Sequence, residues 1–435
     1  MAPRPHGGAS DSLIGWWDRF GDAVLVSIQQ AAEKASPSLD QAVARIDQAR
    51  ATLRSARAEG RPSVNGSGSY SRSSQSFSSG GQTIEQNSDG FQLSGDASWE
   101  IDLFGKVRRK NQAARARIEA RVDDWHDARI SLAAEVADYY VQLRGCEQLA
   151  DLYRQQAESQ DETARLTRIS ANAGFTAPAD AALTDAGRAS TRSSYIDQIA
   201  QCDLLVKSLV SLSGMEESAL RALIEPGHGV MPAAPLLAIT SVPADLVRQR
   251  PDIAANEREL AATSAEIGVA VADLYPSLSL SGSISRGGGI RSWSFGPTLS
   301  LPLFDGGAAR AGVASAKAAY ALQLATYREA IRAAVLEVEQ ALVRLDAVGV
   351  RDAEAERAAK GYQVSFEATD RLRVAGSVSM IDRESARRNA LDAARTLVSL
   401  RTQRMQYWIA LYKALGGGWD ATTASASSST GVHTQ

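Results

Sequence analysis

The two halves of this 435-residue sequence carry the same landmarks in the same order, which indicates an internal duplication. Three pairs of short segments match: Arg61 to Val64 with Tyr275 to Leu278, Leu103-Phe104 with Leu303-Phe304, and Ala173-Gly174 with Ala375-Gly376. The first pair is offset by 214 residues and the last by 202, because a Ser- and Gly-rich stretch is shorter in the second half. We therefore expect both halves to adopt the same fold.

Between the first two landmarks, each half alternates with a period of two, as a β-strand with one apolar and one polar face does. The apolar or small positions of the first half are Phe91, Leu93, Gly95, Ala97, Trp99, Ile101 and Leu103. Those of the second half are Trp293, Phe295, Leu299, Leu301 and Leu303. A weaker alternating segment precedes each strand, so we predict β-hairpins over about 62–104 and 276–304.

After each hairpin the apolar period becomes that of a helix with a heptad seam. The second-half seam is Tyr320, Leu324, Tyr327, Ile331, Ala334, Val338, Ala341 and Leu345. The same seam occurs 202 residues earlier, where only Arg129 breaks it. The seams stop at Gly174 and Gly376, so each half is predicted to contain a long antiparallel helical hairpin, over about 106–215 and 306–416.

These elements define a domain organisation. The first repeat is predicted to cover 1–224 and to begin with a lead-in helix, and a linker follows over 225–240. The second repeat, again with a lead-in helix, covers 241–420, and the Ser- and Thr-rich residues 421–435 are expected to form a disordered tail.

The strands also constrain the assembly. Four one-sided strands cannot close a barrel within one chain, and an open sheet edge is not tolerated in lipid. Three copies would supply a 12-stranded barrel, and the long helices would bury their seams in a hollow helical cylinder. The predicted fold class is therefore mainly α with a small transmembrane β-barrel, formed by a trimer. The large apolar strand residues are expected to face lipid: Phe91, Leu93, Trp99, Ile101, Leu103, Trp293, Phe295, Leu299 and Leu301.

Composition excludes several other classes. There are 47 Lys and Arg against 50 Asp and Glu, a net charge of −3, which gives no indication of nucleic-acid binding. The histidines His6, His126, His228 and His433 are scattered, and no catalytic, phosphate-binding or cofactor motif is present. We expect no enzymatic activity, metal or cofactor.

Several segments resemble the TolC/OprM-type outer-membrane efflux family, in the branch that serves resistance-nodulation-division pumps. They are Trp16 to Phe20, Leu246 to Ile253, Tyr275 to Ser277 and Leu411 to Trp419. The resemblance implies a homotrimer in the lipid of the Gram-negative outer membrane that extends into the periplasm and docks to a periplasmic adaptor and an inner-membrane pump. The written sequence has neither a signal peptide nor the N-terminal Cys of lipidated relatives, so we expect that a leader is missing.

The resemblance also implies functional residues at the helix tips. Asp382 matches the acidic position that lines the closed periplasmic aperture, with Ser385 one helical turn further on. The alternative for Asp382 is an ordinary carboxylate near a helix N-terminus. Contact with the adaptor, or a role at the tip, is expected for Gly174, Asp180, Arg371, Arg373 and Gly376, although the two arginines could also be charges that suit a helix C-terminus.

The spacing of the two cysteines supports a further prediction. Cys146 precedes Gly174 by as many residues as Cys202 follows it, so the two thiols should stand at the same height in the first helical hairpin. An oxidising periplasm would allow them to form a disulfide. The alternative is two unrelated buried thiols.

Three functions are consistent with these patterns. The first is an exit duct that conducts drugs or other toxic small molecules from a periplasmic pump and adaptor to the exterior. The second is a type I protein-secretion duct of the same fold, and the third is a soluble coiled-coil scaffold. The one-sided strands disfavour the scaffold, and the segment from Tyr412 to Trp419 favours the efflux branch.

Overall fold

The computed structural model describes residues 17–79, 82–233, 249–287 and 289–417. The predicted tail at 421–435, part of the predicted linker (234–240) and the start of the second lead-in helix (241–248) lie outside the described residues. Within those residues, no helix is both long enough and apolar enough to cross a bilayer.

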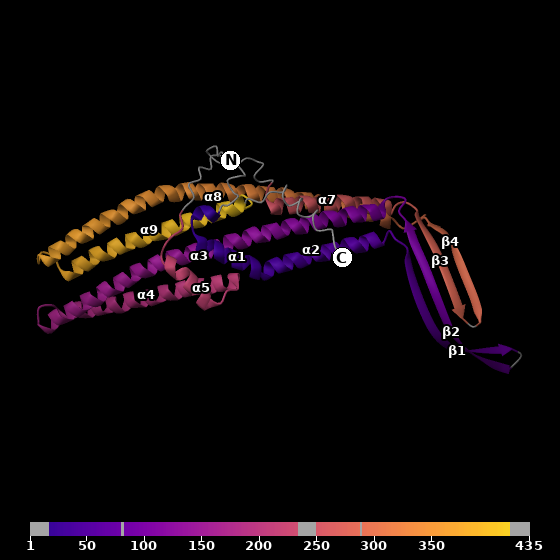
Figure 1. The fold of residues 1–435 in the computed structure, drawn as a ribbon, viewed down its shortest axis with the longest axis horizontal. Coiled ribbons are helices and arrows are strands. Elements are labelled where there is room, and N and C mark those ends of the chain that lie inside the picture. The colour runs from indigo at the N-terminus through magenta and orange to yellow at the C-terminus, as the bar shows by residue number, and fades with distance from the viewer. Residues whose placement is uncertain (1–16, 80–81, 234–248, 288, 418–435) are drawn as a thin grey trace. The chain divides into compact units, whose positions relative to one another are not determined.

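The elements follow the order that the duplication predicts (Figure 1). In the first half they are η2 (Trp17–Phe20), α1 (Ala23–Ala35), α2 (Pro37–Ala58), β1 (Ser63–Ser79), β2 (Gln82–Ile101), α3 (Lys106–Asn172), α4 (Pro178–Ser213), α5 (Glu217–Ile224) and η3 (Glu225–Gly227). In the second they are α7 (Pro251–Ala272), β3 (Ser277–Gly287), β4 (Ile290–Ser300), α8 (Ala308–Val374) and α9 (Met380–Ala414). The first lead-in segment is two helices, α1 and α2, because the chain is extended at Ser36, before Pro37.

The four strands form one antiparallel sheet in the order β1-β2-β3-β4. Three predicted strand residues, Leu103, Leu301 and Leu303, lie beyond the ends of β2 and β4. Asp102 ends the first strand because its carboxylate accepts hydrogen bonds from the backbone of Val107 and Arg108 and so caps α3. In the second half, Pro302 has no N–H to donate to a strand ladder.

The helices α3 and α8 each contain 67 residues and end in the same way. At Gly174 φ is 79° and at Gly376 it is 77°, the left-handed conformation that favours glycine. Phe175 N donates to Ser170 O and Ser377 N to Leu372 O, both at 2.9 Å, which satisfies carbonyls at each helix end. The predicted turn glycines therefore end equivalent helices, each followed by a returning helix, α4 or α9.

The described residues divide into two compact units. One draws on Met1–Gln41, Trp125–Ile253 and Ile331–Gln435, and the other on Ala42–Asp124 and Ala254–Ala330. Each unit thus contains segments from both halves of the sequence. The division into sequence repeats is a different one and stays a prediction.

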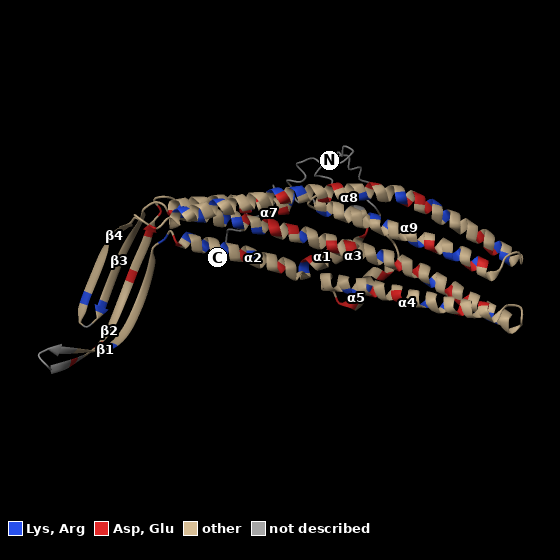
Figure 2. Cartoon of the chain, turned by 180° about the vertical axis from the view of Figure 1, so that it is seen from behind, with Lys and Arg blue, Asp and Glu red and all other residues tan. Residues whose placement is uncertain are grey.

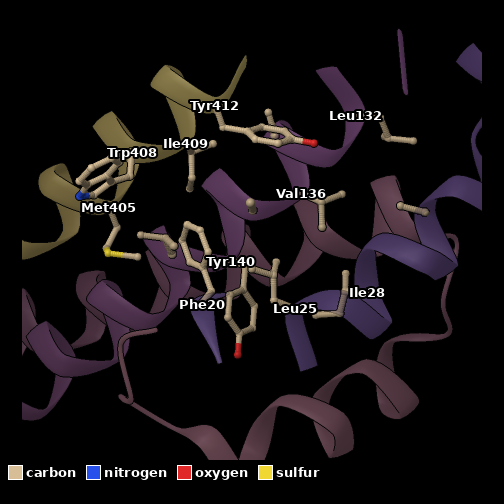
Figure 3. Packing of buried hydrophobic residues seen from close by; sticks show 14 of the residues in the cluster. Phe20, Leu25, Ile28, Leu132, Val136, Tyr140, Met405, Trp408, Ile409 and Tyr412 are labelled. Carbon is tan, nitrogen blue, oxygen red and sulfur yellow. The ribbon is translucent and has the colours of Figure 1, made fainter. Parts of the chain in front are cut away.

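The main hydrophobic core lies in the first unit, where η2, α1, α3, α4, α5, α8 and α9 meet. Figure 3 shows its centre, in which Tyr140 and Val136 of α3 lie beside Leu25 and Ile28 of α1, and Trp408 of α9 belongs to the same cluster. The predicted seam residues Val136, Leu143, Ala334 and Val338 are buried. Arg129, which interrupts the seam, is exposed and pairs with Glu33 at 2.7 Å.

The second unit contains the sheet and a helical part. Small side chains and ion pairs stabilise this helical part, whereas large apolar side chains form the core of the first unit. Ala113 of α3 packs on Ala262 and Ala265 of α7, so these helices approach through small side chains. Ion pairs also join α3 to α7 and the residues just after it, including Lys106 with Asp273 at 2.6 Å. Figure 2 shows that charges of both signs are spread along the helices, whereas the strands carry few.

Candidate functional site

The sheet has one face of hydroxyl groups. Cross-strand serines lie within hydrogen-bond distance at several points, among them Ser67 with Ser94 at 2.7 Å, Ser283 with Ser294 at 2.8 Å, and Ser285 with Ser292 at 2.7 Å. These serines have the opposite parity from the apolar strand residues, so they form rows on one side of the sheet. Such a face suits contact with water.

The other face is apolar, and its residues are cross-strand neighbours. Gly282 of β3 lies opposite both Ala97 and Phe295, and Leu278 lies opposite both Ile101 and Leu299. Phe91, Leu93, Trp99, Trp293, Phe295 and Leu299 are all exposed large apolar side chains of this face. The pairing therefore brings the predicted lipid-facing residues that lie within β2 and β4 together on one surface, and their contact with lipid stays a prediction.

Aromatic residues mark both ends of this apolar face. Tyr70 pairs with Phe91 at the end that faces the hairpin turns, and Trp293 lies midway along the face, in the row of Gly95 and Ile284. At the other end lie Trp99, which donates from Nε1 to Gly60 O at 3.0 Å, and the stacked rings of Phe104 and Tyr275. The separation of Phe91 and Trp99 along β2 is roughly 26 Å at ~3.3 Å per residue, comparable to the ~25 Å apolar band of membrane barrels.

At the tip of the second helical hairpin, Asp382 forms a capping box with Ser379. Asp382 N donates to Ser379 Oγ at 3.1 Å, and Ser379 N donates to the Asp382 carboxylate at 3.2 Å. Hydrogen bonds from the Ser379 hydroxyl and backbone lower the pKa of Asp382 below its usual value, so this exposed carboxylate is ionised at neutral pH. The residue thus has a role as a helix cap, while its place at an aperture stays a prediction.

In the described part of the chain, the side-chain hydrogen bonds of Asp382 go to Ser379 and not to the other predicted tip residues. Ser385 is half-buried, one turn along α9. Arg373 Nε lies 3.8 Å from Asp370 of its own helix, and Arg371 is exposed. Asp180 lies in the first turn of α4, where a carboxylate suits the helix N-terminus.

Sequence reasoning missed a buried carboxylate next to Asp382. Glu384 of α9 is only 6% exposed, and it accepts hydrogen bonds from Ser159 at 2.9 Å and Thr163 at 3.3 Å, both on α3. Arg383 beside it pairs with Asp370 of α8 at 2.5 Å. Polar contacts thus tie α9 to both long helices near the tip. No local pattern marks Glu384, because its partners lie more than 200 residues away in the sequence.

The structure joins Cys146 of α3 to Cys202 of α4 by a disulfide, with the Cα atoms 5.6 Å apart. Gln198 lies beside it and donates from Nε2 to Cys146 Sγ at 3.0 Å. Elsewhere in the described ranges, no three His, Cys, Asp or Glu side chains come together in a group that could hold a metal ion.

Comparison with known proteins identifies a consistent set of relatives. The sequence matches the family described as outer membrane efflux protein over residues 28–215 and 242–417. It is 31% identical to nodulation protein T of Rhizobium leguminosarum bv. trifolii, over 94% of this chain and 89% of that protein. It is also 31% identical to outer membrane protein OprJ of Pseudomonas aeruginosa, over 74% of this chain and 69% of that protein.

A solved structure of the outer-membrane channel OprN has the same fold. It superposes with a TM-score of 0.82 at 28% identity and covers 96% of this chain and 98% of that one. The predicted fold class, mainly helical with a small sheet built from two β-hairpins, is therefore confirmed. The trimer and the closed 12-stranded barrel stay predictions.

Proposed function

Since the chain belongs to the outer membrane efflux protein family, we propose that it is the outer-membrane exit duct of a tripartite efflux system. In this role it passively conducts drugs or other toxic small molecules from a periplasmic pump and adaptor to the exterior. The substrate is chosen by the pump, because a wide water-filled duct need not select its contents.

The two-faced sheet carries this proposal. Its apolar face lies between two sets of aromatic residues, and its other face is lined with serines. In a closed barrel this arrangement places apolar side chains against lipid and hydroxyl groups around a wet lumen. A soluble scaffold would gain nothing from an exposed surface that contains Phe91, Trp293 and Phe295.

A homotrimer is proposed because the chain leaves surfaces that only further copies can complete. The edge strands β1 and β4 have one partner each among the described residues. On α8, Leu336, Val343 and Val350 are exposed at seven-residue spacing, and the first two line a surface groove. Copies that pair β4 with the next β1 would remove the edges and cover apolar stripes of this kind.

The helix tips are the proposed contact with the adaptor. Phe175 and Val374, beside the turn glycines Gly174 and Gly376, expose most of their apolar surface at the ends of the two hairpins. Relatives with efflux functions include the pyoverdine export protein OpmQ of P. aeruginosa, at 29% identity. By this likeness, the proposed partners are a periplasmic adaptor and a resistance-nodulation-division pump, and three copies of Asp382 would line the periplasmic aperture.

Reconstitution of the purified protein in planar bilayers tests the duct directly. We expect trimeric mass in mild detergent and discrete conductance steps. Co-expression with an adaptor and pump in a strain that lacks its own outer-membrane duct should lower the accumulation of a dye substrate. A pump variant that cannot transport is the control. Monomeric mass without conductance would refute the proposal.

A further inference from the structure

At the outer end of the apolar face, two arginines lie directly opposite each other. Arg286 of β3 pairs in register with Arg291 of β4, and Arg286 also lies opposite Leu93 of β2. By strand parity, both share the face of Ile284 and Trp293, two residues away on the same strands. Like charges at directly opposite positions destabilise a strand pair, so the arrangement calls for a counter-charge.

The part of the chain that the structure describes does not supply that counter-charge. Both arginines are exposed, and neither forms an ion pair with any residue in the described part of the chain. The other hairpin differs, because Arg72 there lies opposite Asp89, which also accepts a hydrogen bond from Tyr70 at 3.4 Å. On this face the first hairpin therefore carries a complementary pair and the second a like-charged pair.

A neighbouring copy does not supply it either. In a closed barrel β4 would pair with β1 of the next chain, and residues 63–79 of β1 contain no Asp or Glu. The counter-charge must then come from outside the protein. Bidentate guanidinium groups match phosphate oxygens in both charge and geometry.

The level of the pair in the membrane identifies the source of the phosphate. The arginine row is level with Leu93, two positions inside the Tyr70–Phe91 pair, and aromatic girdles occur at the level of the lipid headgroups. The long arginine side chains can extend over this distance to the headgroups. All the helices continue from the opposite ends of the strands, so the arginines lie at the outer boundary if the helices extend into the periplasm.

We propose that Arg286 and Arg291 form a binding site for the phosphate of an outer-leaflet lipid headgroup, one site per chain and three per trimer. This inference rests on the proposed function, because it requires the sheet to be inserted in the outer membrane. The site would anchor a lipid beside β4, next to the seam where two copies meet.

Native mass spectrometry of the detergent-solubilised protein, titrated with diphosphoryl lipid A, tests this proposal. The double variant Arg286→Gln/Arg291→Gln should bind this lipid roughly tenfold or more weakly, as the loss of charge-assisted hydrogen bonds predicts. Arg54→Gln/Arg57→Gln removes two exposed arginines from α2 and should bind like the wild type. Arg286→Lys/Arg291→Lys should retain part of the affinity.

Three results would overturn the site: equal binding by the Gln variant and wild type, equal binding of dephosphorylated lipid A, or displacement by millimolar inorganic phosphate. Trimer mass and conductance are recorded on the same samples. A conducting trimer whose lipid binding is independent of these arginines refutes the lipid site alone. A wild-type protein that neither assembles nor conducts refutes the proposed function and this inference together.

Discussion

Asp382 and Asp123 are carboxylates in opposite surroundings. Asp382 is exposed, and hydrogen bonds from Ser379 lower its pKa, so it stays ionised well below neutral pH. Asp123 of α3 is buried, and burial raises its pKa to about 6 against the opposing effect of Arg258. Their different environments lead to different predictions.

If three copies of Asp382 line the aperture, their removal should weaken block by multivalent cations. Asp382→Asn is expected to reduce cation block in planar bilayers, because the ring of negative charge that attracts the cation is lost. Asp180→Asn changes the carboxylate in the first turn of α4 and should leave the block unchanged. Equal block in both variants and the wild type would place Asp382 away from the conduction path.

Asp123 should make stability depend on pH. Its folded-state pKa, about 6, lies above the ordinary value of 3.8, so the folded state binds the proton more tightly and loses stability as pH rises from about 4 to 6. Asp123→Asn should therefore stabilise the protein at pH 7 by about 1–3 kcal/mol, with no gain below pH 4. Thermal unfolding across this range measures the effect, with the exposed Asp47→Asn as control. A gain that does not vary with pH would contradict the assignment.

Individual residues also show which features could be predicted from the sequence and which could not. Gly174 and Gly376 could be identified from local pattern, because a helix end and its glycine are adjacent in sequence. Asp123 and Glu384 could not. Their burial depends on other helices, and Glu384 meets its partners on α3 only after both helical hairpins have formed.

At the scale of elements, strand parity predicts which substitutions the sheet tolerates. Phe295 lies in the middle rows of the apolar face, opposite Gly282, whereas Ser294 lies on the serine face. Phe295→Arg should destabilise the inserted protein by ~2–4 kcal/mol, and Ser294→Arg should be tolerated. Yield of folded trimer and unfolding in detergent measure the difference. Similar losses at both positions would mean that the two faces do not meet different environments.

The disulfide between α3 and α4 should contribute substantially to stability. It closes a loop with a sequence separation of 56 residues, for which chain entropy gives about 4 kcal/mol. Reduction should lower the unfolding temperature of the wild type, and Cys146→Ser/Cys202→Ser should reproduce this loss and no longer respond to the reductant. A wild-type protein that is insensitive to reductant would contradict the prediction.

The two faces of the strands and the position of the disulfide could be predicted from the sequence, because both depend on counting residues along regular elements. The end of β2 could not, because Asp102 acts as a cap only once α3 has formed. The pairing of β2 with β3, which makes one sheet from two hairpins, also has no local signal.

At the scale of the whole molecule, assembly should depend on the exposed stripe of α8. Val343→Glu places a charge in the groove that we assign to another copy, so the trimer should dissociate more readily in mild detergent. Gln340→Glu adds a charge at a polar position of the same groove and should have a smaller effect. Mass measurement over a range of protein concentrations decides the matter. An unchanged trimer in Val343→Glu would remove this stripe from the interface.

The pairing of β2 with β3 also determines when the sheet can form during synthesis and export. Ile101 pairs with Leu278, so the sheet cannot form until most of the chain has been synthesised and exported. The chain between Ile101 and Leu278 is a long loop, and closing it is slow. Until it closes, the apolar residues of the first hairpin are exposed to water without their partners. The newly exported chain is therefore most prone to aggregate before its second half arrives, and a holding factor that shields the first hairpin would be needed most during that interval.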